Sequence, residues 1–212
     1  MNDDNQGRTG LIHIVDDEEY PRTATARLLS AYGFEVRTYV SAVDFLKRFV
    51  PDGPGCLVLD VQMEELTGLE LQTVLNDRED SLSIVFLSGR AEIPDSVLAI
   101  RRGAIDFLTK PLDGDVLAEA VSRGLARSAA RQIELTRQHE LRRRYERLTP
   151  REREVLQHLI SGQLNKQAAA DLNISERTIK AHRAQVFSKM EVESIAELVR
   201  VAEDLQVSPA KH

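Results

Sequence analysis

The first 125 residues alternate short apolar runs with longer stretches in which apolar positions recur every three or four residues. The short runs predict buried strands, and the longer pattern predicts amphipathic helices. Strands are expected at residues 11–15, 34–36, 56–59, 84–87 and 105–108, and helices at 20–32, 41–49, 67–77, 94–102 and from 114 onward. Five such units in alternation predict an α/β fold with a doubly wound five-stranded parallel sheet.

Several of these helices carry start signals in the sequence. A hydroxyl or carboxylate placed just before a helix accepts hydrogen bonds from its free amides, and proline fits its first turn. Such residues precede or open four helices: Ser41 with Asp44, Thr67 with Glu70, Pro94, and Asp113.

Residues 148–212 show only the helical period and predict an all-α domain of four helices. The first opens at Pro150 and stops at Gly162, the second covers 165–172, and the third runs from its cap at Ser175 to Met190. A fourth opens at Ser194. Thr149 with Glu152, and Ser194 with Glu197, predict capping boxes. A tight turn at 172–175 between two helices predicts a helix-turn-helix, whose second helix enters the DNA major groove.

Residues 125–147 contain no proline or glycine and are expected to form a helical linker that continues the helix from residue 114. Their apolar positions keep no regular heptad, which favours a solvated spacer over a coiled coil, although both remain open. Arg142, Arg143, Arg144 and Arg147 could contact nucleic-acid phosphates or could form a solvated face beside Glu140 and Glu146.

The composition is that of a globular chain large enough for two domains, with 42% hydrophobic and 29% charged residues in 212. The single cysteine, Cys56, excludes an internal disulfide, and the sequence has no Cys/His cluster with zinc spacing. The N-terminus is polar and no apolar run approaches the ~20 residues of a membrane span, so we expect a cytoplasmic protein without membrane contact.

The net charge of −6 argues against a nucleic-acid partner only if the two halves of the chain are not considered separately. Residues 1–124 carry 22 acidic and 12 basic side chains, a net charge of −10, whereas residues 125–212 carry 12 acidic and 16 basic ones, a net charge of +4. This asymmetry predicts that the two halves have different partners.

The chemistry of the first half gathers at the carboxyl ends of the predicted strands, where doubly wound sheets bind ligands. Asp16 and Asp17 follow the first strand, Asp60 the third, Ser88 the fourth and Lys110 the fifth. Converging carboxylates need a hard cation such as Mg²⁺, and a lysine and a hydroxyl beside them favour a phosphoryl group. Taken singly, each residue also fits an ordinary role as a helix cap, a turn or a helix stop.

Four segments around these residues resemble the receiver domain of two-component response regulators, which has a flavodoxin-like fold. They are residues 13–18 (HIVDDE), 57–63 (LVLDVQM), 86–89 (FLSG) and 103–111 (GAIDFLTKP). The resemblance covers about residues 10–125, and we place the receiver domain at 10–124.

The resemblance implies a role for each residue. Asp60 would be the phosphoacceptor, taking the group from a sensor histidine kinase or a small acyl phosphate. Asp16, Asp17, Asp60 and the backbone carbonyl of Gln62 would hold Mg²⁺ or Mn²⁺. Lys110 and Ser88 would bind the phosphoryl oxygens, and Phe107 would move into the space that Ser88 vacates, held by packing alone because it lacks a hydroxyl.

The sequence departs from the receiver pattern after Met63, where Glu64 and Glu65 replace the usual proline. Two further negative charges near a phosphate site are expected to affect phosphorylation or partner choice. Gln62 and Arg90 lie where the family tunes the lifetime of the phosphate, but the direction of their effect does not follow from the sequence.

The third helix of the second domain combines a core face, expected from Ile179, Val186 and Met190, with a cationic outer side. That outer side is expected to contain Arg177, Lys180, His182, Arg183 and Lys189. Such a helix is favourable for phosphate contact but also occurs as a plain solvated helix.

Three segments of this domain resemble the LuxR-type helix-turn-helix: residues 148–156 (LTPREREVL), 165–169 (NKQAA) and 174–183 (ISERTIKAHR). Together with a receiver, this is the arrangement of FixJ/NarL-type regulators, and the FixJ-like branch matches best. The resemblance implies that Lys180, Ala181 and Ala184 face bases. It implies that Asn165, Lys166, Thr178, His182 and Arg183 mostly anchor backbone phosphates.

We therefore predict a response regulator and not an enzyme: phosphorylation of Asp60 would produce a homodimer that binds two-fold promoter DNA and acts on RNA polymerase. Two alternatives remain. An aspartate-nucleophile phosphatase usually has a second acid two residues after the nucleophile, where this chain has Gln62. A phosphorylation-independent DNA-binding protein would not need the five site residues that the chain retains.

Overall fold

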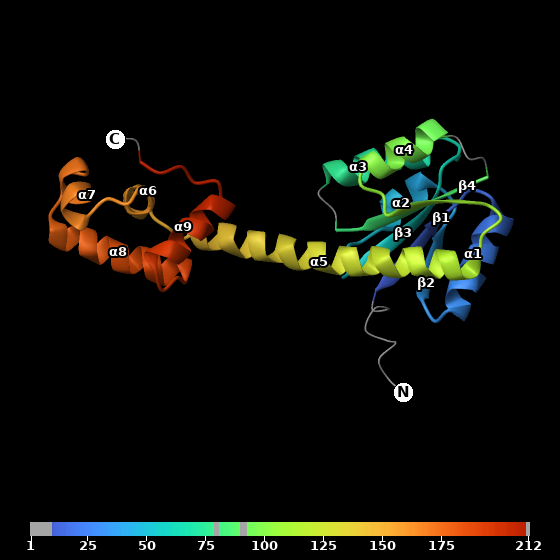
Figure 1. Cartoon of the computed structure of the whole chain (residues 1–212), viewed down its shortest axis with the longest axis horizontal. Helices are drawn as coiled ribbons and strands as arrows, with labels where there is room; N and C mark the ends of the chain where they lie inside the picture. Colours follow the sequence, from blue (N-terminus) through green and yellow to red (C-terminus); the bar gives the residue numbers. More distant parts are fainter. Residues whose placement is uncertain (1–9, 79–80, 90–92, 211–212) are drawn as a thin grey trace. The chain divides into compact units, whose positions relative to one another are not determined.

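The computed structural model describes residues 10–78, 81–89 and 93–210 (Figure 1). These residues form two compact units that divide between Ile133 and Glu134. None of the helices in the described ranges is both long enough and apolar enough to cross a membrane.

The first unit contains the predicted five-stranded parallel sheet. Its strands are β1 (Leu11–Val15), β2 (Glu35–Tyr39), β3 (Gly55–Asp60), β4 (Ser83–Ser88) and β5 (Asp106–Thr109). The order β2-β1-β3-β4-β5 is that of the flavodoxin-like doubly wound fold, so the predicted fold class is confirmed. The sequence placed the second strand at 34–36, too early, because β2 is an edge strand whose exposed polar residues break the apolar run.

Five helices alternate with these strands: α1 (Glu19–Ala31), α2 (Ala42–Arg48), α3 (Gly68–Asp77), α4 (Ile93–Arg101) and α5 (Gly114–Glu146). Side chains of β3 point alternately to the two faces of the sheet. Leu57 and Leu59 pack with residues of α2, α3 and α4 in one core cluster, whereas Cys56 and Val58 pack with residues of α1 and α5 in another. The sheet is thus buried on both faces, which explains the continuous apolar runs of its central strands.

The predicted caps position the helices around the sheet. Thr67 and Glu70 form a complete capping box at the start of α3, and Ser41 accepts a hydrogen bond from the Asp44 amide at the start of α2. Asp113 accepts hydrogen bonds from the backbone amides of residues 115 and 116 at the start of α5.

The second unit contains α6 (Pro150–Ile160), α7 (Asn165–Asp171), α8 (Glu176–Met190) and α9 (Ile195–Asp204), packed around one apolar core. The capping box of Thr149 and Glu152 forms as expected. The one expected at Ser194 is incomplete: Ser194 caps α9, but the Glu197 carboxylate accepts from the Glu193 amide and not from the Ser194 amide.

The residues expected to form a linker lie in α5 as far as Glu146, and each end contributes to a unit. Leu125 is buried in the core of the first unit, and Tyr145 packs against the core of the second. Arg144 and Arg147 form ion pairs with Glu191, at 2.9 and 3.4 Å, and Arg144 also pairs with Glu140. These carboxylates favour the solvated salt-bridged face over direct phosphate contact for both arginines.

Candidate functional site

The parallel sheet brings the predicted receiver residues to one edge. Asp16 follows β1 directly, Asp60 ends β3, Ser88 ends β4, and Lys110 follows β5. Because all five strands are parallel, these positions share the carboxyl edge of the sheet. Asp16, Asp60 and Ser88 are buried there, and Lys110 is partly buried.

Lys110 joins the two buried carboxylates of this edge. Its Nζ donates to Asp60 Oδ1 at 2.7 Å and to Asp16 Oδ2 at 2.9 Å. The second oxygen of Asp60 accepts from the Gln62 amide at 2.8 Å, and the second oxygen of Asp16 accepts from the Glu18 amide at 2.9 Å. Both carboxylates are therefore held in fixed orientations by charge-assisted hydrogen bonds.

Burial and charge act in opposite directions on this pair. Burial raises the pKa of the Asp60 carboxyl above its ordinary value, and the nearby Asp16 charge adds to the effect, although Lys110 and the Gln62 amide oppose it. Burial would lower the pKa of Lys110, but its hydrogen bonds to Asp60 and Asp16 outweigh this and raise it. Lys110 therefore carries its charge at neutral pH and compensates one of its two neighbours.

Asp17 and the residues after Asp60 form the mouth of the site. Asp17 Oδ2 accepts from the Glu64 amide at 2.9 Å, and both residues line an open hollow together with Gln62 and Met63. Glu64 and Glu65 are exposed, and Glu65 has a left-handed backbone with φ of 62°. The sequence identified Glu64 only as an added charge, because nothing in the pattern shows that its amide holds Asp17.

The expected cluster of three metal-binding carboxylates is not formed. Among residues 10–78, 81–89 and 93–210, no three His, Cys, Asp or Glu side chains are grouped so that they could hold a metal ion. Two contacts explain this arrangement: Lys110 lies between Asp16 and Asp60, and Asp17 is turned toward the Glu64 amide. The donor set itself, carboxylate and carbonyl oxygens with two buried acids against one ammonium, fits a hard divalent cation.

Two residues expected to act as a switch lie on neighbouring strands. Ser88 pairs in register with Thr109, and its carbonyl accepts from the Lys110 amide at 2.8 Å. The Phe107 ring is partly buried, 6.1 Å from the Phe86 ring between centroids, and packs against the cluster that contains Leu59. The packing around Phe107 is thus apolar, which suits a ring that has no hydroxyl group.

Gly68 is a further residue of this site that the sequence did not single out. Its amide donates to the Val61 carbonyl at 3.1 Å, and a Cβ at this position would overlap the carbonyl oxygen of Asp60. Only glycine allows α3 to begin so close to the strand that carries Asp60.

The second unit presents α8 as a surface helix with one buried side. Ile179, Val186 and Met190 are fully buried, as predicted. Lys180, Ala181 and Ala184 are exposed, whereas Thr178, His182 and Arg183 are partly buried. The exposed side of α8 therefore combines two small alanines with Lys180, and Arg177, Gln185 and Ser188 are also exposed on this helix.

Several predicted contact residues also have partners within the domain. The Thr178 amide donates to Ser175 Oγ at 3.1 Å, the hydrogen bond by which Ser175 caps α8. The Arg183 guanidinium lies over the Phe187 ring, 5.2 Å from its centroid. In α7, Lys166 is exposed, and Asn165 has a buried Oδ1 without a hydrogen-bond partner among the described residues.

The expectation that Lys189 belongs to the cationic outer side of α8 is wrong. Its Nζ donates to both oxygens of the buried Glu152 carboxylate, at 3.0 and 2.7 Å. Glu152 also completes the capping box at the start of α6, so Lys189 ties α8 to α6. Sequence spacing on one helix could not show this pairing, because it depends on how two helices pack.

A doubly wound unit with two acids and a lysine at one sheet edge, followed by a helix-turn-helix unit, defines a class of two-domain regulators. The family model described as "Response regulator receiver domain" matches residues 12–122, and the one described as "Bacterial regulatory proteins, luxR family" matches residues 146–202. The chain belongs to the response regulators that combine these two domains.

Relatives and solved structures agree with this assignment over nearly the whole chain. The response regulator protein TodT of Pseudomonas putida is 40% identical over 95% of this chain and 88% of its own length. The transcriptional regulatory protein FixJ of Azorhizobium caulinodans is 40% identical over 94% of both chains. The structure of the response regulator StyR, 40% identical, has a TM-score of 0.79 and covers 92% of this chain and 98% of its own.

Proposed function

We propose that Asp60 accepts a phosphoryl group from a sensor histidine kinase and that this modification controls binding of promoter DNA by α8, which regulates transcription. The receiver would comprise residues 10–124, the linker 125–147 and the DNA-binding domain 148–212. The main support is the contact at the carboxyl edge of the sheet, where the Lys110 ammonium group lies against the buried carboxylates of Asp16 and Asp60. The relatives named as regulators support the transcriptional role.

The chemistry proposed for Asp60 is a direct phosphoryl transfer. A carboxylate oxygen of Asp60 attacks the phosphorus of a phosphohistidine, a new O–P bond forms, the P–N bond breaks, and the imidazole leaves with the bond's electron pair. Lys110 would then bind a phosphoryl oxygen in place of the Asp60 oxygen that it contacts now. Bound by Asp16, Asp17, Asp60 and the Gln62 carbonyl, Mg²⁺ or Mn²⁺ would neutralise charge that develops on the transferred group.

Ser88 and Phe107 are proposed to report the modification to the rest of the receiver. Ser88 ends β4 and would donate its hydroxyl to the phosphoryl group, which draws the following loop inward. Phe107 would then fill the space that Ser88 leaves. Because Phe107 already packs against apolar neighbours, its inward position needs no hydrogen bond.

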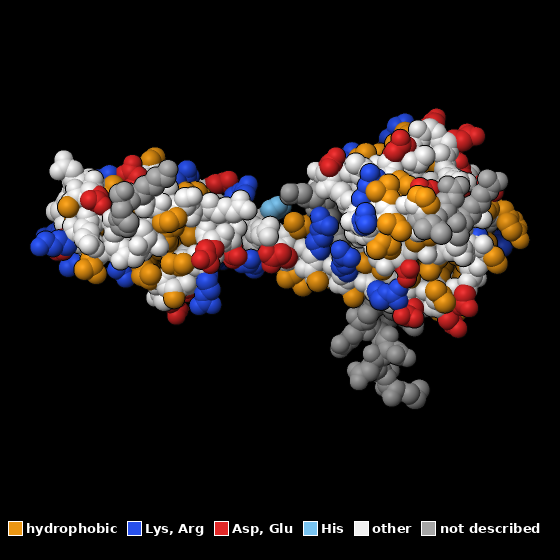
Figure 2. Space-filling view, turned by 45° about the horizontal axis from the view of Figure 1, so that its top comes forward, with side chains coloured by type: hydrophobic (Ala, Val, Ile, Leu, Met, Phe, Trp, Pro, Cys, Tyr) orange, Lys and Arg blue, Asp and Glu red, His pale blue; other side chains and the backbone are white. Residues whose placement is uncertain are grey.

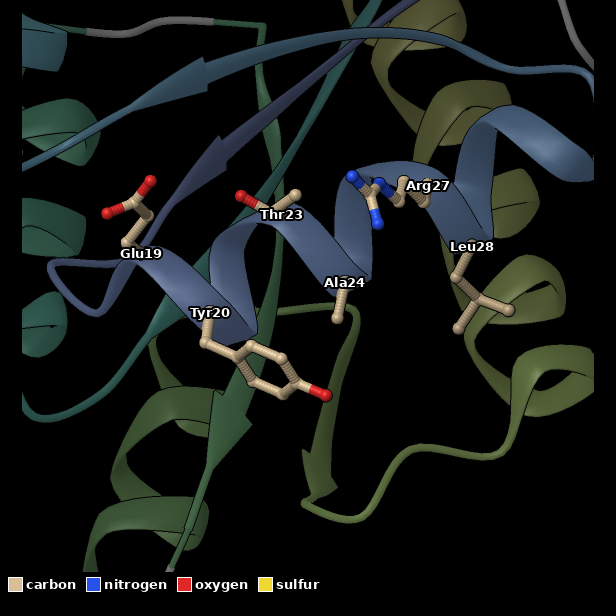
Figure 3. A pocket seen from close by; sticks show the side chains of 6 residues that line it. All are labelled: Glu19, Tyr20, Thr23, Ala24, Arg27 and Leu28. Atoms are coloured by element: carbon tan, nitrogen blue, oxygen red, sulfur yellow. The ribbon is translucent and has the colours of Figure 1, made fainter.

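The kinase is proposed to approach along α1, which begins two residues after Asp17. Figure 3 shows Tyr20, Ala24 and Leu28 on one side of this helix, in a hollow of about 720 Å³ whose other lining residues are Glu19, Thr23 and Arg27. Tyr20 is 86% exposed. An exposed aromatic ring beside the phosphorylation edge suits the apolar centre of a protein interface.

For the DNA-binding domain we propose a dimer whose two α8 helices enter successive major grooves, with half-sites about one DNA turn apart. Lys180, Ala181 and Ala184 would face base edges, and Asn165, Lys166, Thr178, His182 and Arg183 would contact phosphates. The bound dimer would act on RNA polymerase in the cytoplasm. Residues 148–212 carry nine basic and nine acidic side chains, so a single domain is expected to bind weakly.

Phosphorylation is tested with the purified chain, Mg²⁺ and acetyl phosphate. Intact mass should rise by one phosphoryl group in the parent and remain unchanged in Asp60→Asn, and light scattering should show dimers only in the parent. Equal modification of the Asp60→Asn variant would refute the site, and modification without dimerisation would refute the proposed activation.

DNA contact is tested by promoter binding at several salt concentrations. Lys180→Ala should weaken specific binding by about 1–3 kcal/mol, and Arg183→Ala should lower the salt dependence of binding by about one phosphate contact. Glu193→Ala, an exposed change outside α8, serves as the control. Parent-like binding by both α8 variants would show that another surface contacts DNA.

A further inference from the structure

A small cavity lies at the end of the sheet opposite Asp60. Its lining includes Gln72 of α3, Ser83 at the start of β4, Arg102 and Gly103 after α4, and Arg127 and Arg131 of α5. Ser83 is the first residue of β4, whereas Asp60 is the last residue of the parallel strand β3, so the two sites are separated by the length of the sheet. We name this cavity the arginine hollow.

The three arginines of the arginine hollow lack carboxylate partners among the residues that the structure describes. The Arg102 guanidinium donates to the Leu69 carbonyl and to Thr73 Oγ1, and no described residue forms an ion pair with Arg127 or Arg131. Elsewhere on α5, Arg123 pairs with Asp106 and Glu119, and Arg137 pairs with Glu134 and Asp204. Arg142 of α5 also has no ion pair among the described residues, so Arg102, Arg127 and Arg131 are distinguished by lining one cavity together.

The placement of these arginines favours an anion between them. Arg127 and Arg131 are one helical turn apart, where like charges repel each other. The nearest atom to a Cβ built on Gly103 is Nη2 of Arg127, at 3.8 Å, so the Arg127 guanidinium lies beside the turn after α4. Figure 2 shows Lys and Arg side chains gathered on one face of the first unit. Planar guanidinium groups bind oxyanions with pairs of parallel hydrogen bonds.

Gln72 gives the arginine hollow a second, independent signal. Its side chain is 1% exposed, and its Nε2 donates to the Ala99 carbonyl at 3.0 Å. Its Oε1 is buried and has no hydrogen-bond partner among the described residues. A buried acceptor without a partner is uncommon and costly, and it requires a donor, which a bare dianion does not supply.

We propose that the arginine hollow binds a small phosphorylated anion that also carries a hydroxyl group, such as hydrogen phosphate or the phosphate end of a small metabolite. The phosphoryl oxygens would accept from Arg102, Arg127 and Arg131, and the hydroxyl would donate to Gln72 Oε1. The cavity volume, about 140 Å³, is below the ~300–1,000 Å³ of sites for drug-sized ligands and suits a group of this size.

Such an anion would link parts of the receiver that the backbone does not connect directly. Arg102 follows α4, and Arg127 and Arg131 belong to α5, so one ligand would hold the two elements together. No residue of the arginine hollow belongs to the carboxyl edge of the sheet, so this anion would bind at a site separate from Asp60.

The test uses the full ¹⁵N-labelled chain without divalent cations and follows the amide of Gly103 by NMR, with the amide of Gly89 beside Ser88 as a reporter for the other site. Inorganic phosphate, glycerol 1-phosphate, sulfate and chloride are added at matched ionic strength. Saturable shifts of Gly103 with phosphate or glycerol 1-phosphate are expected, and their relative affinities distinguish the free ion from a phosphorylated metabolite. Sulfate, which has no hydroxyl at neutral pH, should bind up to about tenfold more weakly.

Variants separate this site from general attraction of anions. Arg127→Gln with Arg131→Gln should weaken phosphate binding at least about tenfold, whereas Arg142→Gln, an exposed arginine outside the arginine hollow, should bind as the parent does. Gln72→Leu should remove the preference for phosphate over sulfate. The proposal is overturned if chloride shifts Gly103 equally, if the double variant binds like the parent, or if the preference persists in Gln72→Leu.

Discussion

Replacement of Lys110 by methionine tests how the receiver keeps two acids buried side by side. Methionine keeps the apolar stem of the side chain but removes the terminal ammonium group that contacts Asp16 Oδ2 and Asp60 Oδ1. Both carboxylates are buried, and they would face each other without a cation. The variant should therefore lose stability in proportion to the uncompensated negative charge.

The size of this loss follows from the exposure of the three groups. Removing one partner of a fully buried ion pair costs about 3–5 kcal/mol. The side chains of Asp16 and Asp60 are 3% and 9% exposed, but that of Lys110 is 21% exposed, so water reaches the site. We expect a loss of about 2–3 kcal/mol at pH 7.5, below the range for a fully buried pair because of this solvent access.

The loss should depend on pH and on divalent cations. The pKa of Asp60 is already raised, so the folded receiver binds a proton more readily than the unfolded chain. The loss of stability caused by burying the charged Asp60 carboxylate is absent below the ordinary pKa of an aspartate and fully present above the raised pKa of Asp60. Lys110→Met should raise that pKa further, so its destabilisation should shrink as the pH falls, and Mg²⁺ should restore more stability to the variant than to the parent.

Hydrogen exchange of amides in β1 and β3 measures this effect, because it reports the opening of the receiver separately from the second unit. Lys47→Met, an exposed lysine on α2, is the matched control and should change stability by less than about 0.5 kcal/mol. The proposed charge balance would be refuted if Lys110→Met were as stable as this control, or if its loss were the same at every pH.

Four further predictions concern other contacts. Gly68→Ala should destabilise the receiver by about 1–3 kcal/mol, since a Cβ overlaps the Asp60 carbonyl oxygen, and hydrogen exchange near Asp60 should be faster. Glu152→Gln should cost the second unit about 1.5–3 kcal/mol in denaturant unfolding at neutral pH. The pKa of Glu152 is lowered because the hydrogen bonds of Lys189 and Thr149 outweigh burial. In acid the parent's Glu152 becomes protonated and loses the stability that its charge provides, so the parent and Glu152→Gln should then be equally stable. Burial lowers the pKa of His13 to about 4, so the receiver should lose up to about 3 kcal/mol as the pH falls from 6.5 to 4, and a His13→Gln variant should show a flatter dependence. Tyr20→Ala should slow transfer from the kinase while acetyl phosphate still labels Asp60; equal slowing of both would place Tyr20 outside a docking surface.

The sequence predicts the sheet edge well because two simple periodicities determine it. Apolar runs locate the central strands, and parallel strands place the residues after them at one edge. Asp60 and Ser88 are the last residues of β3 and β4, so a shift of one residue in a predicted boundary does not move them away from the site. The edge strand β2 was placed less well, since only Tyr39 of its five residues is buried.

Contacts between elements are beyond such reasoning because they depend on side-chain direction after packing. The position of Lys189 on α8 predicts a surface cation, yet its Nζ donates to the Glu152 carboxylate of α6. Asp17 is expected to be a metal ligand, but the sequence does not show that its carboxylate also accepts from the Glu64 amide. The arginine hollow combines residues from two helices, a strand and the turn after α4 that are up to about 60 positions apart in the sequence, so no local motif could reveal it.

The distribution of arginines along α5 links these observations. Arg123 and Arg137 each form ion pairs with two carboxylates, and Arg144 forms an ion pair with Glu191 within the second unit. A sequence with 34 acidic side chains and 28 basic ones could have provided a carboxylate for every arginine of this helix. Arg127 and Arg131 have none within the described part of the chain, and neither has Arg142, but Arg127 and Arg131 line a cavity that is also lined by Gln72, whose buried side-chain oxygen has no partner. Because unpaired charge and unpaired acceptor coincide there, a ligand that satisfies both explains the arrangement better than two separate defects would.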